Sequence, residues 1–109
     1  MTTSTHPYIG KNVIVVSYDG AVHFGMIKDY DPTTRHVTLS NARRLYLWRG
    51  FSLSEVSQNG MTDRNVKVSQ VVPEKIIMNV IELIPTSEKA TLDLSEYPAY
   101  APMVGSYYE

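Results

Sequence analysis

The stretch that decides the fold is Asn12-Val-Ile-Val-Val-Ser-Tyr-Asp-Gly-Ala-Val-His-Phe-Gly-Met-Ile27. Asp19-Gly20 separates its two apolar runs, and this pair supplies the positive φ angles that a two-residue hairpin turn needs. The next turn is Asp31-Pro-Thr-Thr34, because proline fixes φ and aspartate can accept from nearby amides. His36-Val-Thr-Leu-Ser40 then alternates as a strand. The sequence therefore predicts three antiparallel strands over residues 11–41.

A two-residue turn at Asp19-Gly20 sets the register of the first two strands. It pairs Val16 with His23 and places two sets of side chains on opposite faces: Val13, Val15, Val22, Phe24 and Met26 on one, and Ile14, Val16, His23, Gly25 and Ile27 on the other. The second set is too apolar for a solvated face. We therefore expect both faces to be covered, by sheet curvature, by a later segment or by a partner subunit. Mid-strand Gly25 predicts a bend or bulge.

Beyond the meander, the pattern predicts an extended arm, a short helix and two further strands. Residues 42–50 should be extended, with Arg44, Tyr46 and Trp48 on one side. Ser52-Leu-Ser-Glu55 is a capping box, so a helix is expected from about Leu53 to Gln58, stopped by Asn59-Gly60. The last strands are expected at Val66–Val72 and Lys75–Ile84, separated by Pro73-Glu74.

The fold expected from these elements is all-β: a small, strongly bent, five-stranded antiparallel open barrel with one short helix. The barrel domain would span residues 1–85, with an insertion at 42–65. Residues 86–109 would form a polar and then Pro/Tyr-rich tail, with at most a turn of helix around Leu92 to Leu94. Two prolines among four tyrosines in the tail predict an extended segment: Tyr97, Pro98, Tyr100, Pro102, Tyr107 and Tyr108.

Composition limits the classes of function. The chain has 109 residues, 43% of them hydrophobic and 19% charged, as expected of one globular domain. A net charge of −1 gives no global attraction to nucleic acid or membrane, so any such site must be a local patch. There is no cysteine, no signal-peptide pattern and no membrane-length apolar run. We therefore expect a cytoplasmic protein with no membrane partner.

No motif in the sequence predicts catalysis. The three histidines, His6, His23 and His36, lack the paired spacing of metal ligands, and the glycines form no phosphate-cradling loop. No pair of carboxylates suggests acid and base roles. We expect a protein that is not an enzyme and has neither a metal nor a cofactor.

The segment Ile9 to Asp31 resembles the first motif of Sm-like (LSm) proteins. That motif is a strand, an Asp-Gly turn, a strand containing glycine, and a following aspartate, here Asp19, Gly20, Gly25 and Asp31. The resemblance implies an SH3-type barrel that forms a homo-oligomeric ring and binds single-stranded RNA. The ring would form by strand-edge pairing between Val66–Val72 and Val80–Ile84. The host cell's cytoplasm would be its location if the chain is phage-encoded.

Two departures from the Sm-like pattern concern the base-binding loops. Where the family carries an asparagine beyond the aspartate, this chain has Thr34, Arg35 and His36. Where the family has Arg-Gly, the nearest equivalent is Met78-Asn79.

A second resemblance covers most of the chain. It is similar to small uncharacterised proteins of tailed bacteriophages and marine, cyanophage-like metagenomes, through Gly20–Gly25, Asn41–Gly50, Ser52–Glu55 and Val80–Ala90. That group carries no assigned activity, so the resemblance implies origin and fold.

Basic and aromatic residues alternate after the meander, a pattern that can stack on bases while neutralising phosphates. The alternative is that the aromatic side chains fill a core or a subunit contact. For Arg35 and His36 the alternative is an ordinary polar turn, and for His23 it is packing across the strand pair. The nucleic-acid-binding candidates are Arg35, His36, Arg43, Arg44, Tyr46, Trp48, Arg49, Met78 and Asn79.

Three hypotheses about function follow. The first is a homo-oligomeric Sm-like ring that binds nucleic acid, with single-stranded RNA as the expected ligand. The second is a phage structural or accessory protein that uses the barrel for protein contacts only. The third is a barrel that binds a small molecule or carries an enzymatic activity.

Overall fold

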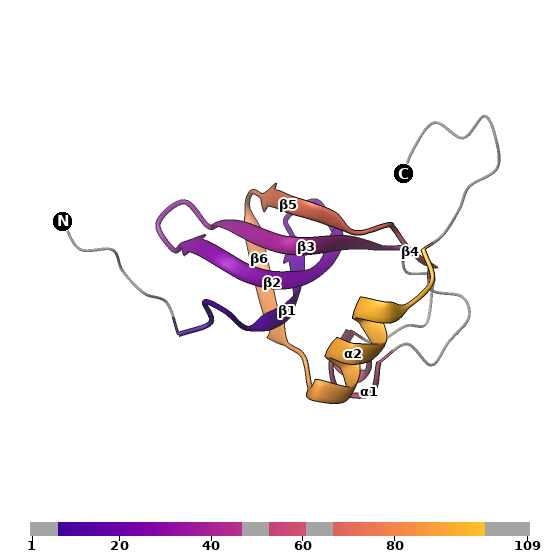
Figure 1. The fold of residues 1–109 in the computed structure, drawn as a ribbon. Helices are drawn as coiled ribbons and strands as arrows, with labels where there is room; N and C mark the ends of the chain where they lie inside the picture. Colours follow the sequence, from indigo (N-terminus) through magenta and orange to yellow (C-terminus); the bar gives the residue numbers. More distant parts are fainter. Residues whose placement is uncertain (1–6, 47–52, 61–66, 100–109) are drawn as a thin grey trace, which may run out of the picture.

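The computed structural model describes residues 7–46, 53–60 and 67–99 (Figure 1). The described part of the chain forms an open antiparallel sheet and two helices. In chain order the elements are β1 (Asn12–Ser17), β2 (Val22–Asp31), β3 (His36–Tyr46), α1 (Leu53–Asn59), β4 (Lys67–Val68), β5 (Val72–Ile77), β6 (Val80–Pro85) and α2 (Glu88–Glu96).

The predicted all-β barrel is wrong: the fold is α+β, with an open six-stranded sheet. The sheet runs β4-β3-β2-β1-β6, and β5 also pairs with β3. No pairing joins β5 to β6 in the part of the chain that the structure describes, so the sheet does not close. The sequence analysis missed one complete helix, α2, because its residues were assigned to a polar tail.

The first hairpin has a longer turn than predicted. Val16 pairs with Val22 and Val15 with His23, so Tyr18-Asp19-Gly20 lies between the paired ends. Gly20 takes φ +91°, a conformation that glycine adopts without strain and that this three-residue turn uses. The predicted register is therefore off by one residue, and each β2 side chain moves to the opposite face relative to β1. His23 consequently shares a face with Val15.

Residues with positive φ also interrupt or separate the later strands. Asn41 (φ 51°) interrupts the alternation of β3, and the register with β2 shifts between Phe24 and Met26. Asn79 (φ 55°) separates β5 from β6. The predicted break at Pro73-Glu74 is wrong, because Pro73 lies within β5. Among the described strands β5 pairs only with β3, so it is an edge strand. An edge strand tolerates a proline, because the missing N–H can face away from the sheet.

The two helices cover one face of the sheet and contact each other (Figure 1). α1 confirms the predicted helix, and Gly60 (φ 84°) ends it. Ser87 caps α2 by accepting from the Ala90 amide. Buried side chains from both helices join one hydrophobic cluster with the sheet: Ile14, Val16, Val22, Phe24, Leu45, Val56, Val68 and Leu94.

The opposite face carries a second hydrophobic cluster. Its buried members come from β1, β2, β3, β5 and β6: Val13, Val15, Ile27, Val37, Leu39, Ala42, Ile77 and Val80. The prediction that both faces are covered is thus confirmed. Mid-strand Gly25 allows close strand approach, since a Cβ there would lie 3.1 Å from the Leu39 Cβ. No helix among the described residues is long and apolar enough to cross a membrane.

Candidate functional site

The side chains of two adjacent arginines of β3 lie on opposite faces of the sheet. Arg43 is buried, 3% exposed, on the helical face. Its Nε donates to the Ser69 carbonyl at 2.9 Å, and its Nη1 donates to the carbonyls of Leu94 and Ser95 at 2.8 and 3.2 Å. Burial lowers the pKa of this guanidinium. Arg43 thus caps the last turn of α2, a turn that has no basic residue of its own.

Arg44 points to the other face and lines a cavity of about 520 Å³. Its guanidinium carbon lies 5.3 Å from the centroid of the Tyr46 ring, a cation–π contact. The Arg44 Nε is buried and has no hydrogen-bond partner. Arg44 is therefore oriented by an aromatic ring and lines the cavity, with its Nε shielded from solvent.

Lys75 on β5 and His23 on β2 complete a group of three nitrogen bases in this cavity. His23 lies opposite Arg44 in the register of β2 and β3. The Lys75 Nζ is 3.5 Å from the His23 Nδ1. Burial first, then the positive charges of Lys75 and Arg44, lower the pKa of His23 to about 4, and Asp19 opposes this shift. At neutral pH the cavity wall therefore holds two cations and a neutral imidazole.

Asp19 is the one carboxylate among the residues that line the cavity. It accepts hydrogen bonds from the Ser17 hydroxyl and the Ala21 amide within the β1–β2 turn. These hydrogen bonds, that of Ser17 first, lower the pKa of Asp19. The carboxylate is thus occupied in shaping the turn, and the charge of the lining residues is positive by one.

Exposed apolar side chains lie beside the charged wall. Tyr18 is 79% exposed, Ile76 58% and Met78 60%, and all three line the cavity. The Tyr18 amide donates to the Asn79 carbonyl at 2.8 Å, which ties the β1–β2 turn to the β5–β6 connection. An aromatic ring and two aliphatic side chains can pack against a planar group whose charged end meets Arg44 and Lys75. We call this set of residues the β3–β5 site: Tyr18, Asp19, His23, Arg44, Lys75, Ile76, Met78 and Asn79.

The predicted site residues divide into several groups. Arg44, Met78 and Asn79 meet in the β3–β5 site, and Tyr46 orients Arg44. The backbone of Arg35 approaches the same region, because its carbonyl accepts from the Val80 amide at 3.0 Å. His36 opens β3, and its residue is only half-buried. Arg43 is engaged in the interior, and Trp48 and Arg49 lie outside the described residues.

Five residues of the β3–β5 site are not among the predicted candidates, namely Tyr18, Asp19, His23, Lys75 and Ile76. His23 is predicted to pack across the strand pair from Val16, whereas it pairs with Val15 and also lines the cavity. Lys75 and Ile76 were placed in one long strand, so their proximity to β3 was not foreseen. The signal that could have found them is Asn79, because asparagine tolerates positive φ and can end a strand.

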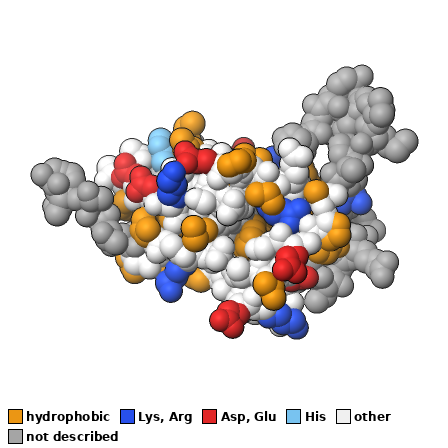
Figure 2. Space-filling view, viewed as in Figure 1, with side chains coloured by type: hydrophobic (Ala, Val, Ile, Leu, Met, Phe, Trp, Pro, Cys, Tyr) orange, Lys and Arg blue, Asp and Glu red, His pale blue; other side chains and the backbone are white. Residues whose placement is uncertain are grey.

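Charges elsewhere on the molecule do not form a single-sign surface. Figure 2 shows acidic and basic side chains interspersed on the face that it displays. An exposed ion pair joins Lys28 to Glu74 at 2.6 Å, and the hydrogen bond to Glu74 raises the pKa of Lys28. Binding of an anion would therefore depend on the local group in the β3–β5 site.

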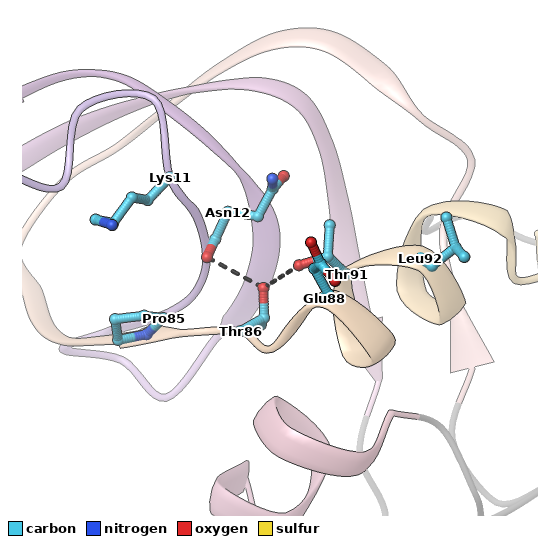
Figure 3. Close-up of a pocket in the computed structure, with 7 residues that line it drawn as sticks. All are labelled: Lys11, Asn12, Pro85, Thr86, Glu88, Thr91 and Leu92. Carbon is cyan, nitrogen blue, oxygen red and sulfur yellow. Dashed lines mark hydrogen bonds between the residues drawn. The ribbon is translucent and has the colours of Figure 1, made fainter.

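A second cavity, of about 510 Å³, lies between the start of β1 and α2 (Figure 3). Its hydroxyl groups already bond to each other or to the backbone. The Thr86 Oγ1 is 2.6 Å from the Thr91 Oγ1 and donates to the Asn12 carbonyl at 3.1 Å. Lys11 and Glu88 give its wall one charge of each sign. This cavity is a joint between helix and sheet and is less suited to an anion than the β3–β5 site.

The chemistry available at the β3–β5 site is recognition of an anion. Two charged donors and an imidazole converge, and charge-assisted hydrogen bonds to phosphate are the strong interactions of such groups. Among the described residues, no group of three His, Cys, Asp or Glu side chains is placed to hold a metal ion.

The chain belongs to a family described as a domain of unknown function, DUF6948, whose profile matches residues 10–94. The matched region includes every strand of the sheet and most of α2, so the helix is part of the family's domain. The description assigns no activity. No curated protein matches the chain.

Proposed function

We propose that this protein binds single-stranded nucleic acid, RNA in the first instance, and that the β3–β5 site holds a backbone phosphate and an adjacent base. The observation that carries the proposal is the convergence of Arg44 and Lys75 on one cavity whose rim is an exposed tyrosine and two exposed aliphatic side chains. Cationic side chains interleaved with a stacking surface are the usual means of binding single strands.

The charged and the apolar residues of the site would contact different parts of the ligand. Arg44, held by the Tyr46 ring, and Lys75 would contact phosphate oxygens. Tyr18 would stack on a base, an interaction worth about 1–3 kcal/mol per base. Asn79 would offer its side-chain amide at the edge of the base. The proposal thus uses three predicted residues, Arg44, Met78 and Asn79, and reassigns Arg43 to the fold.

The homo-oligomeric ring is a further part of the proposal, and free strand edges support it. In the described part of the chain β5 pairs only with β3, and β6 only with β1. Each strand also carries an exposed isoleucine, Ile76 at 58% and Ile81 at 55%. Edge-to-edge pairing between copies would cover both edges. Sedimentation should then give a species larger than the monomer, and a monomer at all concentrations would remove the ring.

The test is binding of a fluorescent oligouridylate, measured by anisotropy over a series of salt concentrations. Removing both cations in R44Q/K75Q should weaken binding at least about tenfold, because charge-assisted hydrogen bonds are worth about 1.5–3 kcal/mol each. It should also lower the slope of log affinity against log salt by about one.

The matched control is K11Q/K89Q, which removes the same charge from two lysines that do not line the β3–β5 site. This variant should bind like the unmodified protein. If the unmodified protein is folded and does not bind oligouridylate at low salt, the nucleic-acid proposal is overturned. The exposed apolar rim would then be assigned to protein contacts, the second of the three hypotheses.

A further inference from the structure

His23 occupies an unusual position for a histidine, between a hydrophobic cluster and a cationic cavity. It pairs with Val15 on β1 and Arg44 on β3, and its residue is only 6% exposed. Yet it lines the β3–β5 site, with Nδ1 3.5 Å from the Lys75 ammonium. The geometry lets Lys75 donate to a neutral imidazole at Nδ1, which would place the imidazole proton on Nε2.

Charged groups approach this imidazole from three elements. Lys75 comes from β5, Arg44 from β3 and Asp19 from the β1–β2 turn, and of these only Asp19 favours the protonated ring. Val15 on β1 brings no charge. Burial and the two cations lower the pKa of His23 to about 4. The imidazole is therefore neutral at pH 7, although it lies where an anion would be bound.

An anion in the cavity reverses this balance. A phosphate between Arg44 and Lys75 would neutralise the positive field that now opposes protonation, and it would also attract an imidazolium directly. Resting on the proposed function, we infer that His23 is the third cationic contact of the bound phosphodiester and takes up one proton when the ligand enters. Binding and protonation are then linked, so that acidification tightens binding.

The size of the pH effect on affinity depends on how far the bound ligand raises the pKa of His23. Each unit by which the ligand raises the pKa of His23 allows affinity to increase by up to about tenfold as pH falls through the bound-state value. A rise from about 4 into the range of an ordinary histidine would make the effect visible between about pH 8 and about pH 5.5. We expect an increase of about threefold to tenfold over that range.

The experiment is oligouridylate binding at fixed salt from about pH 8 to about pH 5.5, with an oligonucleotide that has a 5′-hydroxyl and a 3′-dye. Neither uracil nor a phosphodiester titrates in this range. The unmodified protein should bind more tightly as pH falls, H23Q should show no such increase, and H36Q should keep it. H36Q is the matched control, because His36 opens β3 and does not line the β3–β5 site.

Equal pH dependence in H23Q and the unmodified protein would overturn the inference while leaving the proposed function in place. Binding that is independent of pH in the unmodified protein would do the same. Absence of binding at every pH would remove the proposed function and the inference with it. If H23Q does not fold, NMR titration of the His23 ring in the unmodified protein decides: a higher pKa with oligouridylate supports the inference, and an unchanged one overturns it.

Discussion

The two faces of β3 show what one strand can do with two neighbouring arginines. On the helical side, Arg43 is buried and donates hydrogen bonds to three backbone carbonyls. On the other side, the Arg44 guanidinium lies over the Tyr46 ring and lines a cavity, and only its Nε is buried without a partner. An arginine side chain thus stabilises the fold at position 43, and at position 44 an arginine side chain lines a cavity where it could contact an anion. Satisfied donors indicate structure, and oriented donors beside a cavity indicate binding.

Apolar side chains also fall into a buried group and an exposed group. Truncating one of each should give the largest difference in the free energy of unfolding. Leu94 is fully buried beneath the sheet, whereas Ile76 is 58% exposed at the β3–β5 site. L94A should lower the free energy of unfolding by about 2–5 kcal/mol, since a buried leucine leaves a cavity. I76A should change it by less than about 0.5 kcal/mol. Urea denaturation followed by circular dichroism measures both, and equal losses would erase the distinction between the two regions.

The paired arginines allow the comparison to be made with one type of substitution. R43Q should destabilise the protein by about 2–3 kcal/mol, because buried carbonyls of Ser69 and Leu94 lose charged donors. R44Q should cost much less in stability, and oligouridylate affinity should fall instead. Thermal melting measures the stability of both variants, and anisotropy measures their affinity for oligouridylate. A stable R43Q that binds poorly would show that the roles are reversed.

The low pKa of His23 predicts how stability depends on pH when no ligand is present. The folded-state value is about 4, below the unfolded value near 6.5. The unfolded chain therefore binds more protons between these values, so stability is full above pH 6.5 and is lost as pH falls toward 4. A loss of order 3 kcal/mol is expected by about pH 4. Urea denaturation of the unmodified protein and H23Q tests this, because a slope that persists in H23Q would assign the effect to other groups.

The sequence predicted local elements better than their assembly. Hydrophobic alternation located β1, β2 and the start of β3, and Asn59-Gly60 located the end of α1. The register was wrong because Asp19-Gly20 fits both a two-residue turn and the three-residue turn that forms. The long apolar run from Lys75 to Ile84 concealed a break at Asn79, where positive φ depends on tertiary hydrogen bonds.

The tail and the site show why tertiary information was needed. α2 is short, and isolated helices of this length are marginal in water, so its stability depends on burial of Leu94 and on the Arg43 cap from a distant strand. Arg43 and Arg44 were predicted together, because adjacency in the sequence does not say which face each occupies once Asn41 shifts the alternation. Lys75 and His23 are separated by 52 residues, and only the pairing of β2, β3 and β5 brings them together.

The most direct test of the central claim is an NMR titration that maps where oligouridylate binds. We expect the shifts to concentrate on the β3–β5 site, on the amides of Tyr18 and Asn79 and on the side chains of Arg44, Lys75 and His23, with little change in α2. Shifts centred instead on Lys11, Thr86 and Thr91, around the cavity of Figure 3, would contradict it.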